Sequence, residues 1–449
     1  MRILLAADWK SELVNAIRER RRADYVYMYP PRQAYRAPNG ENIERAIDQS
    51  AMRLADFDLY LHFPFCRQIC AFCNLFAMVS KDNRIPELYI DALELEMKSA
   101  RALFRGKKIN TIYFGGGTPS LLSVTQFQRI MSVIKENFEI NINCISEISM
   151  EVAPDTVARD KIADFVSSGL SRVNLGVQSL DDRAVQAIGR KHGIDVVYDA
   201  ISLCRDAGVK NISVDLIFGL PLQTMAEWRR SVEQAIDIAP ETINLYPFTS
   251  RPYTSFFKMD SGAGDPQRYD KFNEAYECLL ASGYQPETHV RFVRAQSQGG
   301  YLQKANHWSL KNVLGFGAGA RSYLWDIDLR NGYSVLRRED AVKRYVLCIS
   351  EGGRPIDAVY EMSDEERRRK AVALNIMSLQ KKWYESLFGN LPEHDFHEEI
   401  TFLLEENILE QTHQHLALTR YGLQFRDLVA QIFFSSKVKE RIFQFDYHE

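Results

Sequence analysis

The chain has 449 residues, more than a single hydrophobic core usually supports, so we expect two domains with a smaller appendage. Its composition, 46% hydrophobic and 26% charged, is typical of globular proteins and excludes a disordered chain. The net charge of −3 provides no overall attraction to nucleic acids or membranes, and we expect neither as a partner. No segment approaches the roughly 20 apolar residues of a membrane span, and the N-terminal apolar run is too short for a signal peptide. A cytoplasmic location is therefore expected.

Short β-like segments alternate with helical segments from residue 58 onward. The β-like segments are 58–63, 109–114, 145–152, 172–178, 212–218 and 242–248. Helical spacing of apolar residues falls between them, at 88–100, 124–137, 154–168, 195–207 and 226–238. Strands that alternate with helices of this length predict βαβ units and a parallel sheet. Six consecutive units favour an α/β fold of the partial (β/α)6, TIM-like barrel type over a doubly wound sheet.

The two flanks of this α/β segment have a different character. Residues 1–57 begin with a basic, helix-like segment and continue with an aromatic stretch at 25–29, which Pro30 and Pro31 keep extended. Beyond residue 352 the pattern is helical at 374–379, 396–404 and 421–434, with a short hairpin at 408–419. We therefore predict an N-terminal arm (1–57), a barrel domain (58–352) and a small, helical C-terminal domain of winged-helix type (353–449).

Three of the seven cysteines crowd into eight positions, as Cys66, Cys70 and Cys73. A loop with three thiolates can hold three of the four irons of a 4Fe-4S cluster, and the missing fourth ligand leaves one iron open. A structural zinc site is one alternative, with His62 as a nearby fourth ligand. Three buried cysteines without a metal are the other alternative.

The motif around these cysteines is the first of a longer series of sequence blocks. The blocks are Tyr60-Leu-His-Phe-Pro-Phe-Cys66-Arg-Gln-Ile-Cys70-Ala-Phe-Cys73, Tyr113-Phe-Gly-Gly-Gly-Thr-Pro-Ser120, Met150-Glu151-Val-Ala-Pro154, Asn174-Leu-Gly-Val-Gln178-Ser, Asp215-Leu-Ile-Phe-Gly-Leu-Pro-Leu-Gln-Thr224, Asn306-His-Trp308 and Gly315-Phe-Gly-Ala-Gly-Ala-Arg321-Ser. In this order they resemble the HemN-like family of radical S-adenosylmethionine (SAM) enzymes, the group of the oxygen-independent coproporphyrinogen III oxidase. The resemblance covers residues 58–323 well and extends more loosely to the end.

The resemblance implies a 4Fe-4S cluster on Cys66, Cys70 and Cys73 whose open iron binds SAM. An electron delivered through the cluster then splits SAM into methionine and a 5′-deoxyadenosyl radical. The resemblance also implies a second SAM molecule. The positions that match the family's SAM contacts are Tyr60, Phe72, Gly116, Gly117, Thr118, Glu151, Gln178, Arg190, Asp215, Thr249 and Arg321.

The resemblance assigns these positions to the two SAM molecules. The glycines cup the methionine part of the first SAM, and Glu151 binds its amino group. Gln178, Arg190 and Asp215 contact the second SAM, and Tyr60 and Phe72 are aromatic contacts to the two molecules. Structural roles are the alternatives: a tight turn for the glycines, a buried polar network for Asp215, a solvated helix end for Arg190 and core packing for Phe72.

Several positions depart from the coproporphyrinogen oxidase. Leu75 stands where that enzyme has a further cysteine, Arg321 where it has an apolar residue, and Thr249 where it has alanine. The block at 306–308 instead resembles the haem-chaperone branch, HemW, and the class C methyltransferases. We therefore expect a two-SAM enzyme that methylates or cyclopropanates a complex organic or tetrapyrrole-like small molecule. A haem chaperone and a coproporphyrinogen-type oxidative decarboxylase are the alternatives.

The sequence assigns no residue as a general base or proton donor. Glu287 and His289 are candidates for such a role or for structural roles. His413 and His415, in the predicted hairpin, are expected to be solvated and not to bind haem. We expect a small-molecule substrate and an electron donor such as flavodoxin or ferredoxin as partners of a monomeric protein.

Overall fold

The computed structural model describes residues 8–21, 23–38, 42–190, 193–221, 223–249, 254–258, 267–295, 297 and 300–445. By its internal contacts the chain forms two compact units. The larger unit comprises Ala37–His307 and Lys311–Val359, and the smaller comprises Met1–Arg36, Trp308–Leu310 and Tyr360–Glu449. The predicted division at residues 57 and 352 stays a prediction. No helix in the described ranges is both long enough and apolar enough to cross a membrane.

The larger unit is built on a parallel sheet. Its central strands follow one another in sequence order: β1 (Asp56–Phe63), β2 (Lys108–Gly116), β3 (Glu147–Val152), β4 (Arg172–Gln178), β5 (Asn211–Phe218) and β6 (Thr242–Pro247). Each strand pairs in parallel with the next, so all carboxyl ends lie at one edge of the sheet. The predicted α/β fold is confirmed, with strands at the positions expected from the sequence.

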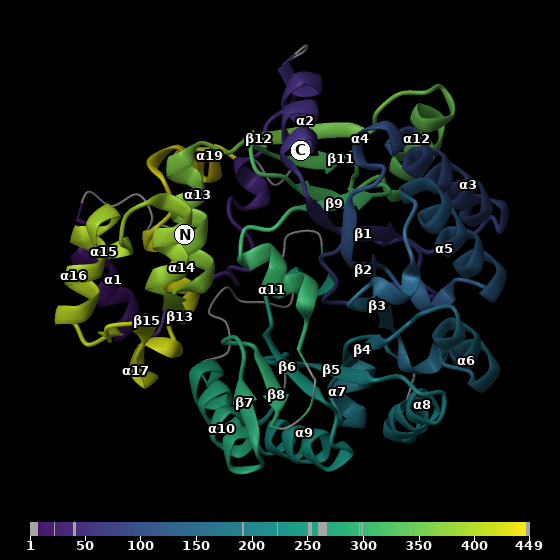
Figure 1. Cartoon of the computed structure of the whole chain (residues 1–449). Coiled ribbons are helices and arrows are strands. Elements are labelled where there is room, and N and C mark those ends of the chain that lie inside the picture. The colour runs from purple at the N-terminus through teal and green to yellow at the C-terminus, as the bar shows by residue number, and fades with distance from the viewer. Residues whose placement is uncertain are drawn as a thin grey trace. The chain divides into compact units, whose positions relative to one another are not determined.

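Helices follow these strands and lie outside the sheet (Figure 1). They are α3 (Arg84–Ser99), α4 (Arg101–Phe104), α5 (Val124–Phe138), α6 (Arg159–Ser167), α7 (Asp182–Ala187), α8 (Ile194–Asp206) and α9 (Met225–Ile238), with 3-10 turns at Pro119–Leu121, Ile142–Cys144 and Pro154–Thr156. The start of α5 is set by Ser123, whose hydroxyl and backbone N–H bond reciprocally with Gln126. Thr224 and Glu227 form the same capping box on α9. These caps satisfy amide groups that the first turn of a helix leaves unpaired.

The two faces of the sheet differ in chemistry, as strand β4 illustrates. Its apolar residues, which are at most 1% exposed, are Val173, Leu175 and Val177. The alternate positions are polar, and Asn174 donates to Asp215 of β5, which also accepts a bond from Asn244 of β6. On β2, Phe114 contacts Phe127 of α5 with ring centroids 5.0 Å apart. Because side chains alternate along a strand, one face packs on the helices and the opposite face carries the polar groups.

Further strands extend the sheet at both edges. β9 (Val313–Phe316) pairs in parallel with β1 and is followed by β10 (Arg321–Tyr323), β11 (Ile327–Asn331) and β12 (Ile356–Glu361). At the other edge, β8 (Arg291–Arg294) and β7 (Tyr284–Pro286) continue antiparallel from β6. The remaining helical segments here are α2 (Asn42–Arg53), α10 (Arg268–Ala281), α12 (Arg338–Ser350) and a 3-10 turn at Ser255–Lys258. α11 (Leu302–Trp308) begins in this unit, where Gln303 donates to the Leu59 carbonyl at 2.8 Å.

The smaller unit is helical, with one small antiparallel sheet. Its helical segments are α1 (Trp9–Arg18), a 3-10 turn at Arg32–Ala34, α13 (Asp364–Asn375), α14 (Lys381–Phe388), α15 (Pro392–Asp395), α16 (His397–Glu405), α17 (Arg420–Leu423), α18 (Arg426–Ile432) and α19 (Ser436–Phe443). The sheet has the strand order β13 (Ser378–Gln380), β15 (His415–Leu418) and β14 (Leu409–Gln411). The predicted helices and hairpin of this region are present, and the winged-helix type stays a prediction.

The predicted helical segment at 374–379 is wrong in its second half. α13 ends at Asn375, and Leu379 lies on β13, where its backbone pairs with Leu416 of β15. Leu374 and Leu379 are both fully buried. A six-residue apolar pattern fits a buried strand as well as a helix, and the pairing with the neighbouring hairpin favours the strand.

Candidate functional site

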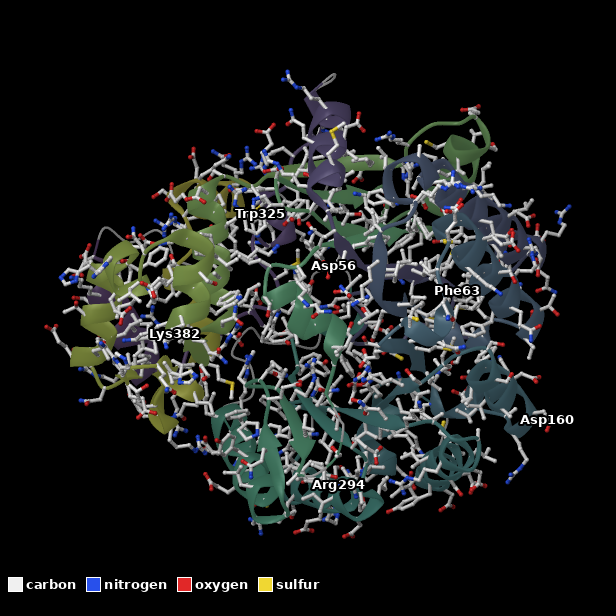
Figure 2. All side chains as sticks on the ribbon, in the orientation of Figure 1. Asp56, Phe63, Asp160, Arg294, Trp325 and Lys382 are labelled. Atoms are coloured by element: carbon white, nitrogen blue, oxygen red, sulfur yellow. The ribbon has the colours of Figure 1, made fainter. Side chains whose placement is uncertain are left out.

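The three clustered cysteines lie on the loop that follows β1, at the carboxyl edge of the parallel sheet. Figure 2 labels Asp56 and Phe63, the first and last residues of β1, and the loop begins after Phe63. Backbone hydrogen bonds hold this cysteine loop on two sides. Cys66 N–H donates to the Met78 carbonyl at 2.8 Å, and Ala71 N–H donates to the Ile188 carbonyl at 3.0 Å. Binding sites of parallel α/β proteins lie at this edge of the sheet.

The three thiols share one half-buried environment and form no disulfides. Burial raises the pKa of the Cys66 thiol to about 12, and it also raises the pKa of Cys73. The charges of neighbouring thiolates add to both shifts, so the three groups resist ionising together without a cation. Iron supplies that positive charge, and three thiolates on one short loop match three corners of a 4Fe-4S cluster. The donor set therefore fits the cluster that the family implies.

His62 is engaged away from the thiols. Its Nε2 lies 2.9 Å from the Phe76 carbonyl oxygen and therefore donates, and its Nδ1 lies 2.9 Å from the Tyr60 hydroxyl and therefore accepts. Burial lowers the pKa of the imidazole to about 4, which keeps the ring neutral. Within the described part of the chain, no three His, Cys, Asp or Glu side chains form a site for a single metal ion. The His62 ring therefore borders the site, and both of its nitrogens are hydrogen-bonded to other groups of the protein.

The glycine turn at the end of β2 lies directly against the cysteine loop. Gly116 has a φ of +119°, which other residues rarely adopt, and a Cβ at this position would lie 2.8 Å from the His62 ring. A Cβ on Gly117 would lie 2.6 Å from the Phe65 carbonyl oxygen and 3.0 Å from the Cys66 sulfur. Both positions therefore require glycine because of this packing, whatever the turn binds.

Glu151 lies on β3, beside the glycine turn. Its Oε1 accepts a hydrogen bond from the Tyr113 hydroxyl at 3.0 Å, and its Oε2 accepts one from Gly116 N–H at 3.0 Å. Burial raises the pKa of this carboxyl group to about 7, although the two hydrogen bonds oppose the rise. A positively charged group that binds beside Glu151 would favour its ionised form.

Asp215 and Gln178 lie on the neighbouring strands of the same polar face. Asn174 and Asn244 donate to the two carboxylate oxygens of Asp215, at 2.6 and 2.8 Å. Burial raises the pKa of Asp215, and these two bonds oppose the shift. Gln178 ends β4 with a φ of +72°, a conformation that is uncommon outside glycine and often marks functional positions. Asp215 is therefore the centre of a buried polar network.

Arg190 follows α7 and reaches the cysteine loop. Its Nε donates to the Cys70 sulfur at 3.3 Å, and its Nη1 donates to the Gly176 carbonyl at the end of β4. The side chain is half-buried, so it is not a solvated helix end. Thr118, which directly follows the glycine turn, donates from its hydroxyl to the Cys66 sulfur at 3.3 Å.

The two aromatic positions have different surroundings. Phe72, on the cysteine loop, packs against an apolar cluster that consists of Ile188, Ile217, Leu220 and Phe256. Tyr60, on β1, stacks on Tyr113 with ring centroids 6.0 Å apart and nearly parallel planes. Tyr60 therefore lies within the polar face next to Glu151, whereas Phe72 helps to fix the cysteine loop to the ends of β5 and β6.

Thr249 and Arg321 lie in separate parts of the sheet. Thr249 follows β6, and its hydroxyl is buried without a hydrogen-bond partner among the described residues. Arg321 begins β10, on the far side of β9 from β1, and its charge adds to the lowered pKa of His62. The structure thus brings the cysteines, Thr118, Arg190, the glycine turn and Glu151 into one continuous group, whereas Thr249 follows β6 and Arg321 begins β10, on opposite sides of β1–β5 in the strand order.

The hydrogen-bond donors to the two half-buried carboxyl groups were not predicted from the sequence. Tyr113 holds Glu151, and Asn174 and Asn244 hold Asp215. The available signal was polar residues at alternate positions of otherwise apolar strands, which indicates a polar interior face. Glu287, a candidate base, pairs with Arg291 at 2.8 Å instead.

A second missed group lies behind Tyr113. The Tyr301 ring stacks on Tyr113 with centroids 4.9 Å apart. Two buried guanidinium groups lie over the same ring. The Cζ atom of Arg172 is 4.7 Å from the ring centroid, and that of Arg291 is 5.0 Å from it. Tyr301 comes from the segment before α11, far from the strands in sequence, so no local pattern indicates this packing.

The parallel sheet, the three-cysteine loop and the glycine turn together define a radical SAM protein, and residues 60–235 match the family model described as the Radical SAM superfamily. The heme chaperone HemW of Bacillus subtilis (strain 168) is 28% identical over 369 residues, which cover 81% of this chain and 95% of that protein. HemW of Escherichia coli (strain K12) is 30% identical over 272 residues, 60% of this chain and 70% of that protein. The solved structure of coproporphyrinogen III oxidase (HemN) from Escherichia coli superposes with a TM-score of 0.80 at 23% identity, covering 92% of this chain and 97% of that one.

The likeness to the solved structure supports the fold over nearly the whole chain. The chain belongs to the HemN-like family of radical SAM proteins, whose members include HemN and HemW. Membership in this family implies a 4Fe-4S cluster and SAM as cofactors.

Proposed function

We propose that the cysteine loop holds the 4Fe-4S cluster and that Glu151 binds the amino group of SAM. The observation that carries this proposal is Glu151 itself, a half-buried carboxyl group beside the glycine turn, which bonds to Gly116 N–H and whose pKa is raised to about 7. Such a group gains a partner when an amino group binds. When bound, the cluster supplies the electron that splits SAM. Cys66, Cys70 and Cys73 are the cluster ligands, and the glycine turn accommodates the methionine part of SAM.

Replacing Tyr113 with phenylalanine should weaken SAM binding by about tenfold, because a hydrogen bond to a charged group contributes about 1.5–3 kcal/mol. Without the hydroxyl, the pKa of Glu151 rises further, so the loss should shrink as the pH is raised from 7 to 9. Equilibrium dialysis of the reconstituted protein with labelled SAM measures both effects. Tyr284→Phe is the matched control, since that buried hydroxyl donates to the Pro240 carbonyl. Unchanged affinity in Tyr113→Phe would contradict the assignment of Glu151.

We also propose a second SAM molecule on the β4–β6 side of the site. The proposal is supported by the left-handed backbone of Gln178 and by the buried hydroxyl of Thr249, which has no hydrogen-bond partner within the described ranges. Equilibrium dialysis at saturating SAM should give two bound molecules per cluster-loaded chain. Thr249→Val, which keeps the shape of the side chain, should reduce the number to one and leave the first molecule in place. One SAM per wild-type chain would argue against a second site.

The substrate that we propose is a tetrapyrrole-like small molecule, modified by methylation or cyclopropanation. Support comes from the relatives, a heme chaperone and a coproporphyrinogen III oxidase, since heme and coproporphyrinogen III are both tetrapyrroles. In this chemistry one SAM yields 5′-deoxyadenosine and the other gives up a carbon unit and becomes S-adenosylhomocysteine. An electron donor such as flavodoxin or ferredoxin supplies the reducing electron to a monomeric protein.

A haem chaperone is the second candidate. It is favoured by one observation, that HemW of Bacillus subtilis is matched over 95% of its length. A chaperone would bind one haem per chain and pass it to a partner protein without consuming SAM.

One experiment separates the candidates. Cluster-loaded protein is incubated with SAM and dithionite, and with haem or coproporphyrinogen III. S-adenosylhomocysteine formed together with 5′-deoxyadenosine supports methylation, and release of carbon dioxide from coproporphyrinogen III supports oxidative decarboxylation. Equimolar haem capture without either product supports the chaperone and overturns the enzymatic proposal.

A further inference from the structure

Each of the three clustered thiol sulfurs accepts one hydrogen bond. The donors come from three different segments: the Thr118 hydroxyl to Cys66, the Arg190 Nε to Cys70 and the backbone N–H of Leu75 to Cys73. Two of these donors are side chains, and both come from outside the cysteine loop. Thr118 follows the glycine turn after β2, and Arg190 follows α7 after β4.

The two side-chain donors are held in place by the backbone around them. Thr118 N–H donates to the Phe65 carbonyl at 2.8 Å, which fixes the threonine against the start of the cysteine loop. Arg190 N–H donates to the Val185 carbonyl at 3.1 Å, and its Nη1 bonds to the Gly176 carbonyl. Both donors are therefore positioned toward sulfur independently of any bound SAM.

Hydrogen bonds to the sulfurs of an iron–sulfur cluster are one of the factors that set its reduction potential. Reduction adds negative charge to the cluster, and a donor that points at a thiolate stabilises that charge. A guanidinium group carries a full positive charge, so its effect exceeds that of a neutral hydroxyl. Removal of either donor should therefore make the cluster harder to reduce.

We propose that Thr118 and Arg190 are positioning residues that raise the reduction potential of the cluster through their bonds to Cys66 and Cys70. The proposal rests on the cluster assigned above. It gives Arg190 a role that precedes SAM binding, in addition to the contact with a second SAM that the family resemblance implies. It also makes the threonine of the glycine block part of the redox centre.

The test is the midpoint potential of the cluster in the absence of SAM, followed by EPR during a redox titration. Thr118→Val removes the hydroxyl but keeps the shape of the side chain, and Arg190→Gln removes the charge. Both variants should have a more negative midpoint potential than the wild-type protein, with the larger shift in Arg190→Gln. Thr118→Ser keeps the hydroxyl, and Arg190→Lys keeps the charge. The midpoint potentials of these two variants should lie closer to that of the wild-type protein.

Iron and sulfide contents are measured on every sample. Arg159→Gln is the charge control, because Arg159 is exposed on α6 and pairs with Asp206. Normal iron content with an unchanged potential in Thr118→Val and Arg190→Gln would overturn the proposal. Loss of iron in both variants would also overturn it, because the donors would then be needed to assemble the cluster. Absence of iron from the wild-type protein would contradict the proposed function itself, so the two failures are distinguishable.

Discussion

Replacing Cys70 with alanine is expected to abolish the cluster and to reduce SAM cleavage to the background of the iron-free protein. The cysteine loop offers three thiols for a cluster with four irons, and a cluster held by two thiolates has two irons without protein ligands. In sequence Cys70 also lies between the other two cysteines of the loop, and its sulfur accepts a hydrogen bond from Arg190 Nε. Iron and sulfide analysis, visible absorbance and the yield of 5′-deoxyadenosine measure the loss.

Cys144→Ala is the matched control for this experiment. Cys144 is an exposed cysteine in the turn before β3, outside the loop that carries the ligands. The control should retain normal iron and normal cleavage. Cleavage that persists in Cys70→Ala at the wild-type rate would disprove the cluster assignment.

Replacing Glu151 with glutamine is expected to weaken SAM binding by roughly 10- to 100-fold at pH 8, because the variant lacks the negative charge that we propose to pair with the amino group. The wild-type protein should show a distinctive pH dependence. The pKa of Glu151 is about 7, so the carboxyl group is mostly protonated below that pH and mostly ionised above it. SAM affinity should therefore rise with pH up to about 7, by about tenfold per unit at the acidic side, and level off above it.

The Glu151→Gln variant should lose this pH dependence together with the affinity, since glutamine does not ionise. Glu147→Gln is the matched control: Glu147 is a buried glutamate on the same strand, bonded to the Ser149 hydroxyl at 2.9 Å. In the Glu147→Gln variant, SAM affinity should still rise with pH as it does in the wild-type protein. Dissociation constants measured by equilibrium dialysis between pH 6 and 9 test the prediction, and a wild-type profile that stays flat across pH 7 would refute it.

The parallel strands and the cysteine loop were predictable because their signals are local. Each central strand is a short apolar run between helical segments, and the three cysteines fall within eight positions. The helix starts were also visible, as at Ser123 and Gln126 of α5. At such a helix start, residues that are neighbours in sequence satisfy one another's hydrogen bonds, so the signal is contained in the local sequence.

The partners of the site residues were not predictable, because they depend on register between distant strands. Asn244 reaches Asp215 only because β6 pairs with β5 at those positions. Tyr301 reaches Tyr113 from nearly two hundred positions away, without a local pattern to indicate it. The contact between Arg190 and Cys70 is of the same kind, since a loop after β4 meets a loop after β1.

The division of the sheet into a polar face and an apolar face has a consequence for how this fold can evolve. Barrels of the TIM type usually fill their interior with bulky apolar side chains, whereas here Asn174, Asp215 and Asn244 occupy that face. The apolar packing that resists unfolding lies on the opposite face, in contacts such as Phe114 with Phe127. Because these polar side chains bond to one another, exchange of a single one leaves its partner without a hydrogen bond, which costs about 1–3 kcal/mol. Changes on this polar face are therefore expected to occur in matched sets, while the apolar packing on the opposite face stays unchanged.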